Sequence, residues 1–83
     1  MKKSNFNPDI YIVYRILKTL RDRGPMKKTY LALYTKLNYQ RAVRYLEYLQ
    51  TAGLVEVREE VYISRKGIEI LEKIESVLKD LGL

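Results

Sequence analysis

One predicted helix, residues 39–52, carries side chains whose types and spacing suit nucleic-acid recognition. Ala42, Leu46 and Leu49 recur at spacings of four and three residues, so this side of the helix should face a core. Because successive helical residues are about 100° apart, the opposite side carries polar residues: Gln40, Arg41, Arg44 and Tyr48. In a DNA major groove, Gln can bond adenine and Arg can bond guanine through paired hydrogen bonds. The alternative is a solvated helix face with ordinary charges.

A shorter predicted helix, residues 27–34, precedes this one and begins with Lys27, Lys28 and Thr29. The free N–H groups and the positive dipole end of a helix N-terminus suit a phosphate group. Lys36 follows in the connecting turn. We therefore expect these four residues to anchor DNA phosphates. The alternative is that each lysine is simply solvated.

Asn38 ends the connecting turn and is the expected cap of the helix at 39–52. It lies beside the polar face with Tyr39 and Tyr48, and all three are candidates for contact with nucleic acid. The other tyrosines fall at or near apolar positions, and we expect most of them in the core: Tyr11, Tyr14, Tyr30, Tyr34, Tyr45 and Tyr62. Tyrosines also suit base stacking on single strands or a small-molecule pocket, and the sequence leaves both open.

The positive charge is concentrated in the first part of the chain. Residues 1–50 hold eleven Lys and Arg against three acids, a net charge of +8. Residues 51–83 hold five against seven, a net charge of −2. A basic surface of this kind favours nucleic acid over most protein surfaces. The balance places the predicted DNA contact in the first part.

The composition excludes several kinds of chemistry. The 83 residues include no Cys and no His, which removes disulfides, the usual zinc sites, thiol nucleophiles and imidazole bases. The acids after residue 55 fall on a predicted hairpin tip and helix surface among lysines, where solvated pairs are expected. We expect no enzymatic activity, no cofactor and no metal. No apolar run approaches the roughly 18 residues of a membrane span, which predicts an intracellular, cytoplasmic protein without a membrane partner.

Helix start and stop signals frame the first part of the chain. Asn7-Pro8-Asp9 predicts a helix start, with Asn7 as the cap and Pro8 as the first helical residue, and Gly24-Pro25 predicts the end. We expect an N-terminal helix over 8–23 with one main apolar stripe: Ile10, Val13, Tyr14, Leu17 and Leu20. In the next helix the candidate core residues are Tyr30, Leu31, Leu33 and Tyr34.

A hairpin and a last helix follow residue 52. Gly53 is the expected stop, and the β-branched runs 54–58 and 61–63 are separated only by Glu59-Glu60. Arg58 stands at this tip and is a further candidate DNA contact. Ser64 should cap a C-terminal helix over 65–81.

From about residue 9 to residue 81 the chain resembles the winged helix-turn-helix DNA-binding proteins of archaea. The resemblance is carried by KKTYLALYTKLNYQRAVRYLEYLQTAGLVE (27–56) and VYISRKGIEILEKI (61–74). It is closest to the small chromatin-type winged-helix proteins of archaea, which dimerise through a long C-terminal helix. The resemblance implies a mainly α fold in which 27–52 form the helix-turn-helix, 54–63 form the wing, and 65–81 form a dimerisation helix. The helix at 65–81 is shorter than in those relatives, and the tip of the wing is acidic.

Two apolar surfaces predict a homodimer. The last helix carries Leu71, Ile74, Leu78 and Leu81 at spacings of three and four, and Ile12 and Ile16 lie off the main stripe of the first helix. A domain of this size has a thin core that can cover only part of these side chains. We expect all six in a symmetric interface. The alternative is that the first and last helices cover each other within one chain.

The sequence therefore predicts one winged helix-turn-helix domain that binds double-stranded DNA. Residues 1–7 are expected to be a flexible arm, in which Lys2 and Lys3 either track the DNA or belong to a disordered tail. The role would be transcriptional regulation or chromatin organisation, nucleoid-associated if the source is archaeal, and the sequence does not decide between them. The alternatives are a winged-helix module for protein–protein interaction and a binder of RNA or single strands.

Overall fold

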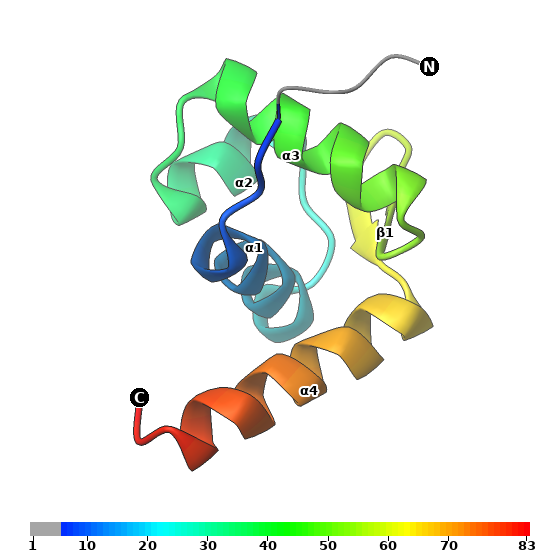
Figure 1. Ribbon diagram of the computed structural model, residues 1–83. Helices are drawn as coiled ribbons and strands as arrows, with labels where there is room; N and C mark the ends of the chain where they lie inside the picture. Colours follow the sequence, from blue (N-terminus) through cyan, green and yellow to red (C-terminus); the bar gives the residue numbers. More distant parts are fainter. Residues whose placement is uncertain (1–5) are drawn as a thin grey trace, which may run out of the picture.

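The computed structural model describes residues 6–83, which form four helices and a two-stranded antiparallel hairpin (Figure 1). In chain order the elements are α1 (Ile10–Arg23), α2 (Lys28–Thr35), α3 (Tyr39–Thr51), β1 (Val55–Val57), β2 (Val61–Ile63) and α4 (Arg65–Asp80). The arrangement confirms the predicted mainly α fold with a small hairpin. Among these residues, no helix has both the length and the apolar character needed to cross a membrane.

The start of α1 differs from the prediction. Asp9, not Asn7, is the N-cap, and its carboxylate accepts a hydrogen bond of 2.8 Å from the N–H of Tyr11. Pro8 consequently precedes the helix. The backbone N–H of Asp9 donates to the hydroxyl of Tyr45 on α3 at 2.9 Å, a tertiary contact that holds Asp9 at the helix boundary. The predicted end is confirmed, because Gly24 caps α1 with a φ of +90°.

The turn between α2 and α3 follows the predicted chemistry. Lys36 ends α2 in the left-handed conformation, with φ 60° and ψ 38°. Leu37, the next residue, is buried in the core. Asn38 caps α3, since its side-chain oxygen accepts a hydrogen bond of 2.8 Å from the N–H of Arg41. This turn sets the direction of α3.

A glycine stop joins α3 to the hairpin. The predicted inward residues Ala42, Tyr45, Leu46 and Leu49 are all buried. Gly53 has a φ of +80°, and the N–H of Leu54 reaches back to the carbonyl of Leu49 at 2.8 Å. This is the 6→1 bond of a Schellman cap, in which the glycine takes the left-handed position.

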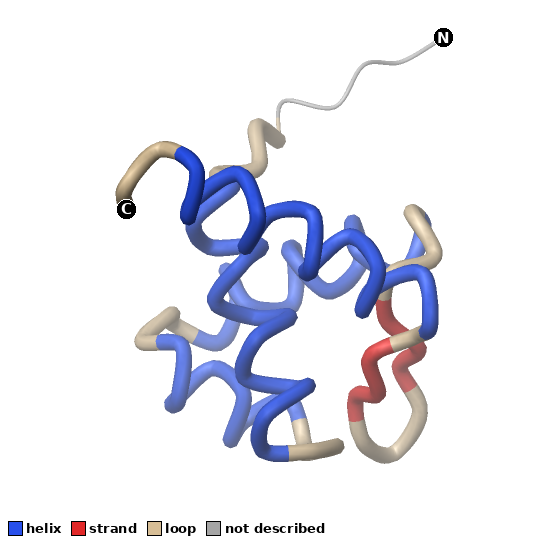
Figure 2. The backbone as a smooth tube through the Cα atoms, turned by 90° about the horizontal axis from the view of Figure 1, so that it is seen from below, coloured by secondary structure: helices blue, strands red, loops and turns tan. Residues whose placement is uncertain are grey.

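The hairpin lies at one edge of the helical body (Figure 2). Its register pairs Val55 with Ile63 and Val57 with Val61, and the loop has three residues, 58–60, one more than predicted. The connection between α1 and α2 adds a bridge that the sequence did not predict, in which the N–H of Val61 donates to the carbonyl of Met26 at 2.8 Å. The predicted cap of α4 is confirmed, because Ser64 accepts a hydrogen bond from the N–H of Gly67.

The core is centred on α1, which packs against α2, α4 and β2. Because neighbours surround α1, its buried face is wider than one stripe and includes Ile12 (5% exposed) and Ile16 (1% exposed). Leu71 of α4 is fully buried in the same core. The assignment of these three residues to a dimer interface was therefore wrong. Ile10, placed on the main stripe by its spacing, is 56% exposed.

The buried face of α2 also differs from the prediction. Leu31, Ala32 and Thr35 face the core, whereas Tyr30, Leu33 and Tyr34 are exposed. Burial of Thr35 is tolerated because its hydroxyl donates to the carbonyl of Leu31 at 2.7 Å.

The predicted burial of most tyrosines was wrong. Tyr45 is buried and Tyr14 is half-buried, but the others placed in the core are exposed: Tyr11, Tyr30, Tyr34 and Tyr62. A tyrosine ring with its hydroxyl is amphipathic, so a position near an apolar stripe does not by itself require burial.

A two-point ion pair ties α4 to α1. Both terminal nitrogens of Arg21 donate to the carboxylate of Glu75 at 2.8 Å. The hydrogen bonds with Arg21 lower the pKa of Glu75, and the positive charge of Arg21 lowers that pKa further. The pair fixes the middle of α4 against the end of α1.

Candidate nucleic-acid interface

Several polar side chains of α3 are exposed, and three of them, Gln40, Arg44 and Glu47, form what we call the outer face. Glu47 lies at its centre, because it borders the surface hollows on both flanks of the helix. The sequence analysis did not select Glu47, although its position opposite Leu46 and Leu49 could have indicated it. A carboxylate can accept a hydrogen bond from the amino group of cytosine, which adds to what Gln and Arg can recognise.

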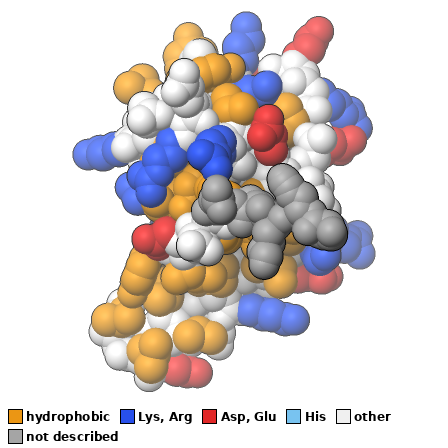
Figure 3. Space-filling view, turned by 45° about the horizontal axis from the view of Figure 1, so that its top comes forward, with side chains coloured by type: hydrophobic (Ala, Val, Ile, Leu, Met, Phe, Trp, Pro, Cys, Tyr) orange, Lys and Arg blue, Asp and Glu red, His pale blue; other side chains and the backbone are white. Residues whose placement is uncertain are grey.

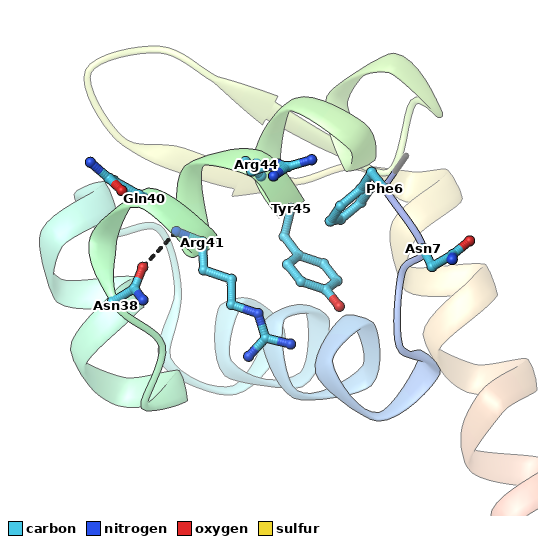
Figure 4. A pocket seen from close by; sticks show the side chains of 7 residues that line it. All are labelled: Phe6, Asn7, Asn38, Gln40, Arg41, Arg44 and Tyr45. Atoms are coloured by element: carbon cyan, nitrogen blue, oxygen red, sulfur yellow. Dashed lines mark hydrogen bonds between the residues drawn. The ribbon is translucent and has the colours of Figure 1, made fainter. Parts of the chain in front are cut away.

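The structure separates residues that the sequence grouped together. Gln40 and Arg41 point in different directions from the first turn of α3 (Figure 4). Arg41 lies on the flank that faces the N-terminal segment, with its guanidinium carbon 5.9 Å from the ring centre of Tyr45. Of the residues predicted to contact bases, Gln40 and Arg44 therefore lie on the outer face, and Arg41 does not.

Residues 6 and 7 belong to the folded body, which corrects the predicted arm of residues 1–7. The ring of Phe6 lies 4.8 Å from that of Tyr45, edge to face, and 5.5 Å from that of Tyr48. The guanidinium of Arg44 lies over Phe6 at 5.4 Å. Tyr48 is thus partly covered by Phe6 and remains 42% exposed. Lys2 and Lys3 lie outside the described residues.

The start of α2 lies on the other flank of α3. Lys27 occupies the N-cap position, and its side chain caps no backbone N–H of the helix. Lys28 borders a hollow of about 230 Å³ together with Glu47, Gln50 and Val57. Thr29 is exposed beside these lysines. The first N–H groups of a helix have no partner within the helix, so those at this end of α2 can donate hydrogen bonds to an anion. The phosphate contact at Lys27, Lys28 and Thr29 stays a prediction.

Lys36 lies at the far end of α2 from Lys28. An eight-residue helix is about 12 Å long, so the backbones of the two lysines lie at opposite ends of that length. Asn38 and Tyr39 are exposed at the start of α3, where Asn38 also lines the hollow beside Arg41. The predicted phosphate contacts therefore form separate groups around α3.

The wing is held beside α3 but is not strongly basic. Gln50 of α3 accepts a hydrogen bond of 3.1 Å from the N–H of Val57. Arg58 is exposed, yet its guanidinium donates to the carboxylate of Glu56 at 2.6 Å and lies over the ring of Tyr62. That hydrogen bond raises the pKa of Arg58 and offsets its charge locally. Glu59 is also exposed at the tip, so the wing presents no excess of positive charge.

A second exposed surface lies between α1 and α4. Figure 3 shows a broad hydrophobic area at the lower left of the molecule, where the start of α1 meets the end of α4. It surrounds a groove of about 380 Å³ whose exposed apolar side chains are Ile10, Tyr11, Val77, Leu81 and Leu83. Large exposed apolar areas of this kind mark interaction surfaces.

The described residues 6–83 bring together no group of three His, Cys, Asp or Glu side chains that could hold a metal ion. The arrangement instead consists of two helices joined by a short turn, a hairpin beside the second, and polar side chains on its outer face. A family model for winged helix-turn-helix proteins matches residues 8–81. The chain belongs to the winged helix-turn-helix family.

A crystal structure of the transcriptional regulator Tm0710 from Thermotoga maritima is similar to this winged helix-turn-helix chain, with a TM-score of 0.69 and 23% sequence identity. The similarity covers 87% of this chain and 61% of that one. At this identity it supports the fold alone. A comparison with curated protein sequences gave no match.

Proposed function

We propose that this winged helix-turn-helix protein binds double-stranded DNA, with the outer face of α3 in the major groove. Winged helix-turn-helix proteins use the second helix of the motif in this way. The observation that carries the proposal is the exposed set Gln40, Arg44 and Glu47 on that helix, within a part of the chain whose net charge is +8. The free N–H groups of α2 beside Lys27 and Lys28 would hold a phosphate on one flank.

We further propose that the role is transcriptional regulation, as the name of the structurally similar Thermotoga protein indicates for that protein. The central position of Glu47 supports this choice over chromatin organisation. A carboxylate repels phosphates and favours binding only where a base donates a hydrogen bond to it, so it promotes sequence preference at the expense of general affinity. A regulator needs a preference of about 10³-fold or more for its site, whereas a chromatin protein needs none.

The active form is proposed to be a homodimer that uses the apolar groove between α1 and α4. Ile74, Leu78 and Leu81 follow one another at spacings of four and three residues along this groove, the pattern of helix–helix seams. A two-fold pairing of α4 would bring two copies of α3 to one DNA duplex and favour a pseudo-palindromic site. Exposed apolar side chains at this edge would then be removed from water.

Replacing Arg44 by Ala is expected to weaken duplex binding about 5- to 150-fold, the equivalent of losing a paired contact to guanine worth roughly 1–3 kcal/mol. The melting temperature should stay within a few degrees, since Arg44 is exposed. Fluorescence anisotropy with duplex, single-stranded and RNA probes of one sequence, at several salt concentrations, provides the measurement. Arg23→Ala is the matched control, because Arg23 is also exposed but lies at the end of α1.

If the Arg44→Ala variant binds duplex DNA with the affinity and salt dependence of the wild-type protein, α3 does not contact the bases of the DNA. Preferred binding to the RNA or single-stranded probe would support those alternatives instead. Absence of binding to every probe would favour the protein–protein interaction module.

Replacing Glu59 and Glu60 by Lys should raise affinity for a duplex of random sequence. Each new phosphate contact releases condensed counterions, so the slope of log K against log salt should steepen by roughly 0.9 per contact. The control is Glu69→Lys with Glu72→Lys, two exposed residues of α4 that change the net charge equally. Equal slopes in the two double variants would mean that the wing tip does not approach DNA.

A further inference from the structure

A polar hollow of about 380 Å³ lies where the N-terminal segment crosses α3 (Figure 4). It is lined by Phe6, Asn7, Asn38, Gln40, Arg41, Arg44 and Tyr45. Two of these side chains are guanidinium groups, and none is an acid. The lining therefore suits an anion.

Aromatic rings support both arginines. Arg44 lies over the ring of Phe6 at 5.4 Å, and Arg41 lies over the ring of Tyr45 at 5.9 Å. Contacts of this type attract the cation to the ring face and limit the positions that its long side chain adopts. Both guanidinium groups are thus held at the hollow before any ligand arrives, which lowers the entropy lost on binding.

Two contacts with Tyr45 help to fix the N-terminal segment to α3 beside this hollow. Phe6 packs edge to face on Tyr45, with ring centres 4.8 Å apart. Three residues later, the N–H of Asp9 donates to the hydroxyl of Tyr45 at 2.9 Å. Phe6 consequently forms one wall of the hollow, although it lies outside the helix-turn-helix itself.

The position of the hollow indicates which anion it would meet. A helix with its side chains is about 10–12 Å across, and the major groove is about 12 Å wide, so a helix in the groove has a sugar-phosphate strand on each flank. One flank of α3 carries Lys28 and the start of α2. The hollow with Arg41 lies on the other flank, where the outer face meets the N-terminal segment.

We propose that this hollow binds a backbone phosphate of the DNA strand opposite the one held by α2, with Arg41 as the phosphate contact and Phe6 as a positioning residue for Arg44. The inference rests on the proposed function and adds a second phosphate site to it. Arg41 thereby fixes the placement of α3, while Arg44 and Gln40 contact bases.

Arg41 is tested with a salt titration on a mixed-sequence duplex. Arg41→Gln should weaken binding and reduce the slope of log K against log salt by about 0.9, because one phosphate contact is lost. The base preference obtained by selection from a randomised pool should stay unchanged. Arg23→Gln, an equal loss of charge at the end of α1, is the control and should leave the slope nearly unchanged.

The role of Phe6 is tested with two variants that separate the effect of its aromatic ring from the effect of its apolar volume. Phe6→Leu keeps an apolar contact with Tyr45 but removes the aromatic face, and it should weaken duplex binding about two- to fivefold. Phe6→Tyr should retain wild-type affinity. In an Arg44→Ala background, Phe6→Leu should have no further effect, since a positioning residue acts only through the group it positions. Thermal melts of each variant identify any loss that comes from unfolding.

Different failures have different meanings. If the unmodified protein binds no duplex, the proposed function fails. If it binds a duplex that Arg44→Ala weakens, yet Arg41→Gln keeps the wild-type slope, the phosphate site alone is overturned. A second outcome would also overturn the proposal. If inorganic phosphate changes the NMR chemical shifts of the residues that line the hollow, while Arg41→Gln keeps the wild-type salt slope, the ligand of the hollow is a free anion. Equal effects of Phe6→Leu with and without Arg44 would overturn the role of Phe6.

Discussion

Replacing Val77 and Leu81 by Glu should give a monomer and weaken binding to a two-half-site duplex by about 10²-fold or more. Val77 of α4 is 55% exposed and Leu81, its C-cap residue, is 66% exposed, so the change should not disturb the core. The loss of affinity follows because a dimer binds its second half-site intramolecularly, at high effective concentration. Sedimentation velocity or light scattering measures the assembly, and anisotropy measures the binding.

Lys79→Glu is the control for this prediction. It changes the net charge by the same two units as the double variant, but Lys79 does not line the groove that contains Ile74 and Leu78. It should remain a dimer. If the unmodified protein is monomeric at micromolar concentration, the proposed homodimer is overturned. A second copy of the chain would then not cover the apolar groove.

Gly67→Ala should lower the free energy of unfolding by about 2 kcal/mol, whereas the same change at an open helix position would raise it. A Cβ atom at Gly67 would overlap the carbonyl oxygen of Leu54, which is backbone, and the side chain of Ile63. Only a glycine lets α4 approach the hairpin this closely. The melting temperature should fall by roughly 8–16 °C for a domain of this size.

Ser76→Ala is the comparison, because Ser76 is exposed in the middle of the same helix. It should be neutral or raise the melting temperature slightly through helix propensity. Gly67→Ala would then change stability in the opposite direction from its control. An unchanged or higher melting temperature for Gly67→Ala would mean that α4 does not pack on the hairpin as the structure has it.

The order of elements was predictable because the signals that define it are local. Asn38 caps the helix that follows it, Gly53 supplies a left-handed stop, and Ser64 caps the last helix within three residues. Each depends on hydrogen bonds between near neighbours in the chain. The buried side of α3 was also predictable from the local sequence. When one side of a helix is covered, its apolar residues recur at the helical spacing of three and four residues.

The predictions that failed concern which other element covers a given side chain. Ile12 and Ile16 are buried because several other elements pack around α1. The spacing of apolar residues within one helix does not show how many neighbours will cover it. Tyr30 is exposed because the covered side of α2 is the side of Leu31 and Thr35. The same limit applies at α1, where a contact with Tyr45 on α3 helps to place the boundary at Asp9.

The sequence by itself determined the succession of helices and hairpin, the position of a polar face on α3, and the absence of Cys and His chemistry. The tertiary structure decided that Phe6 lies beside Arg44, that Arg41 and Gln40 point apart, and that Glu47 borders both flanks of α3. It also decided which apolar side chains stay exposed. The physical reason is that local hydrogen bonds and periodicity act over a few residues, whereas burial depends on packing between segments that are distant in the chain.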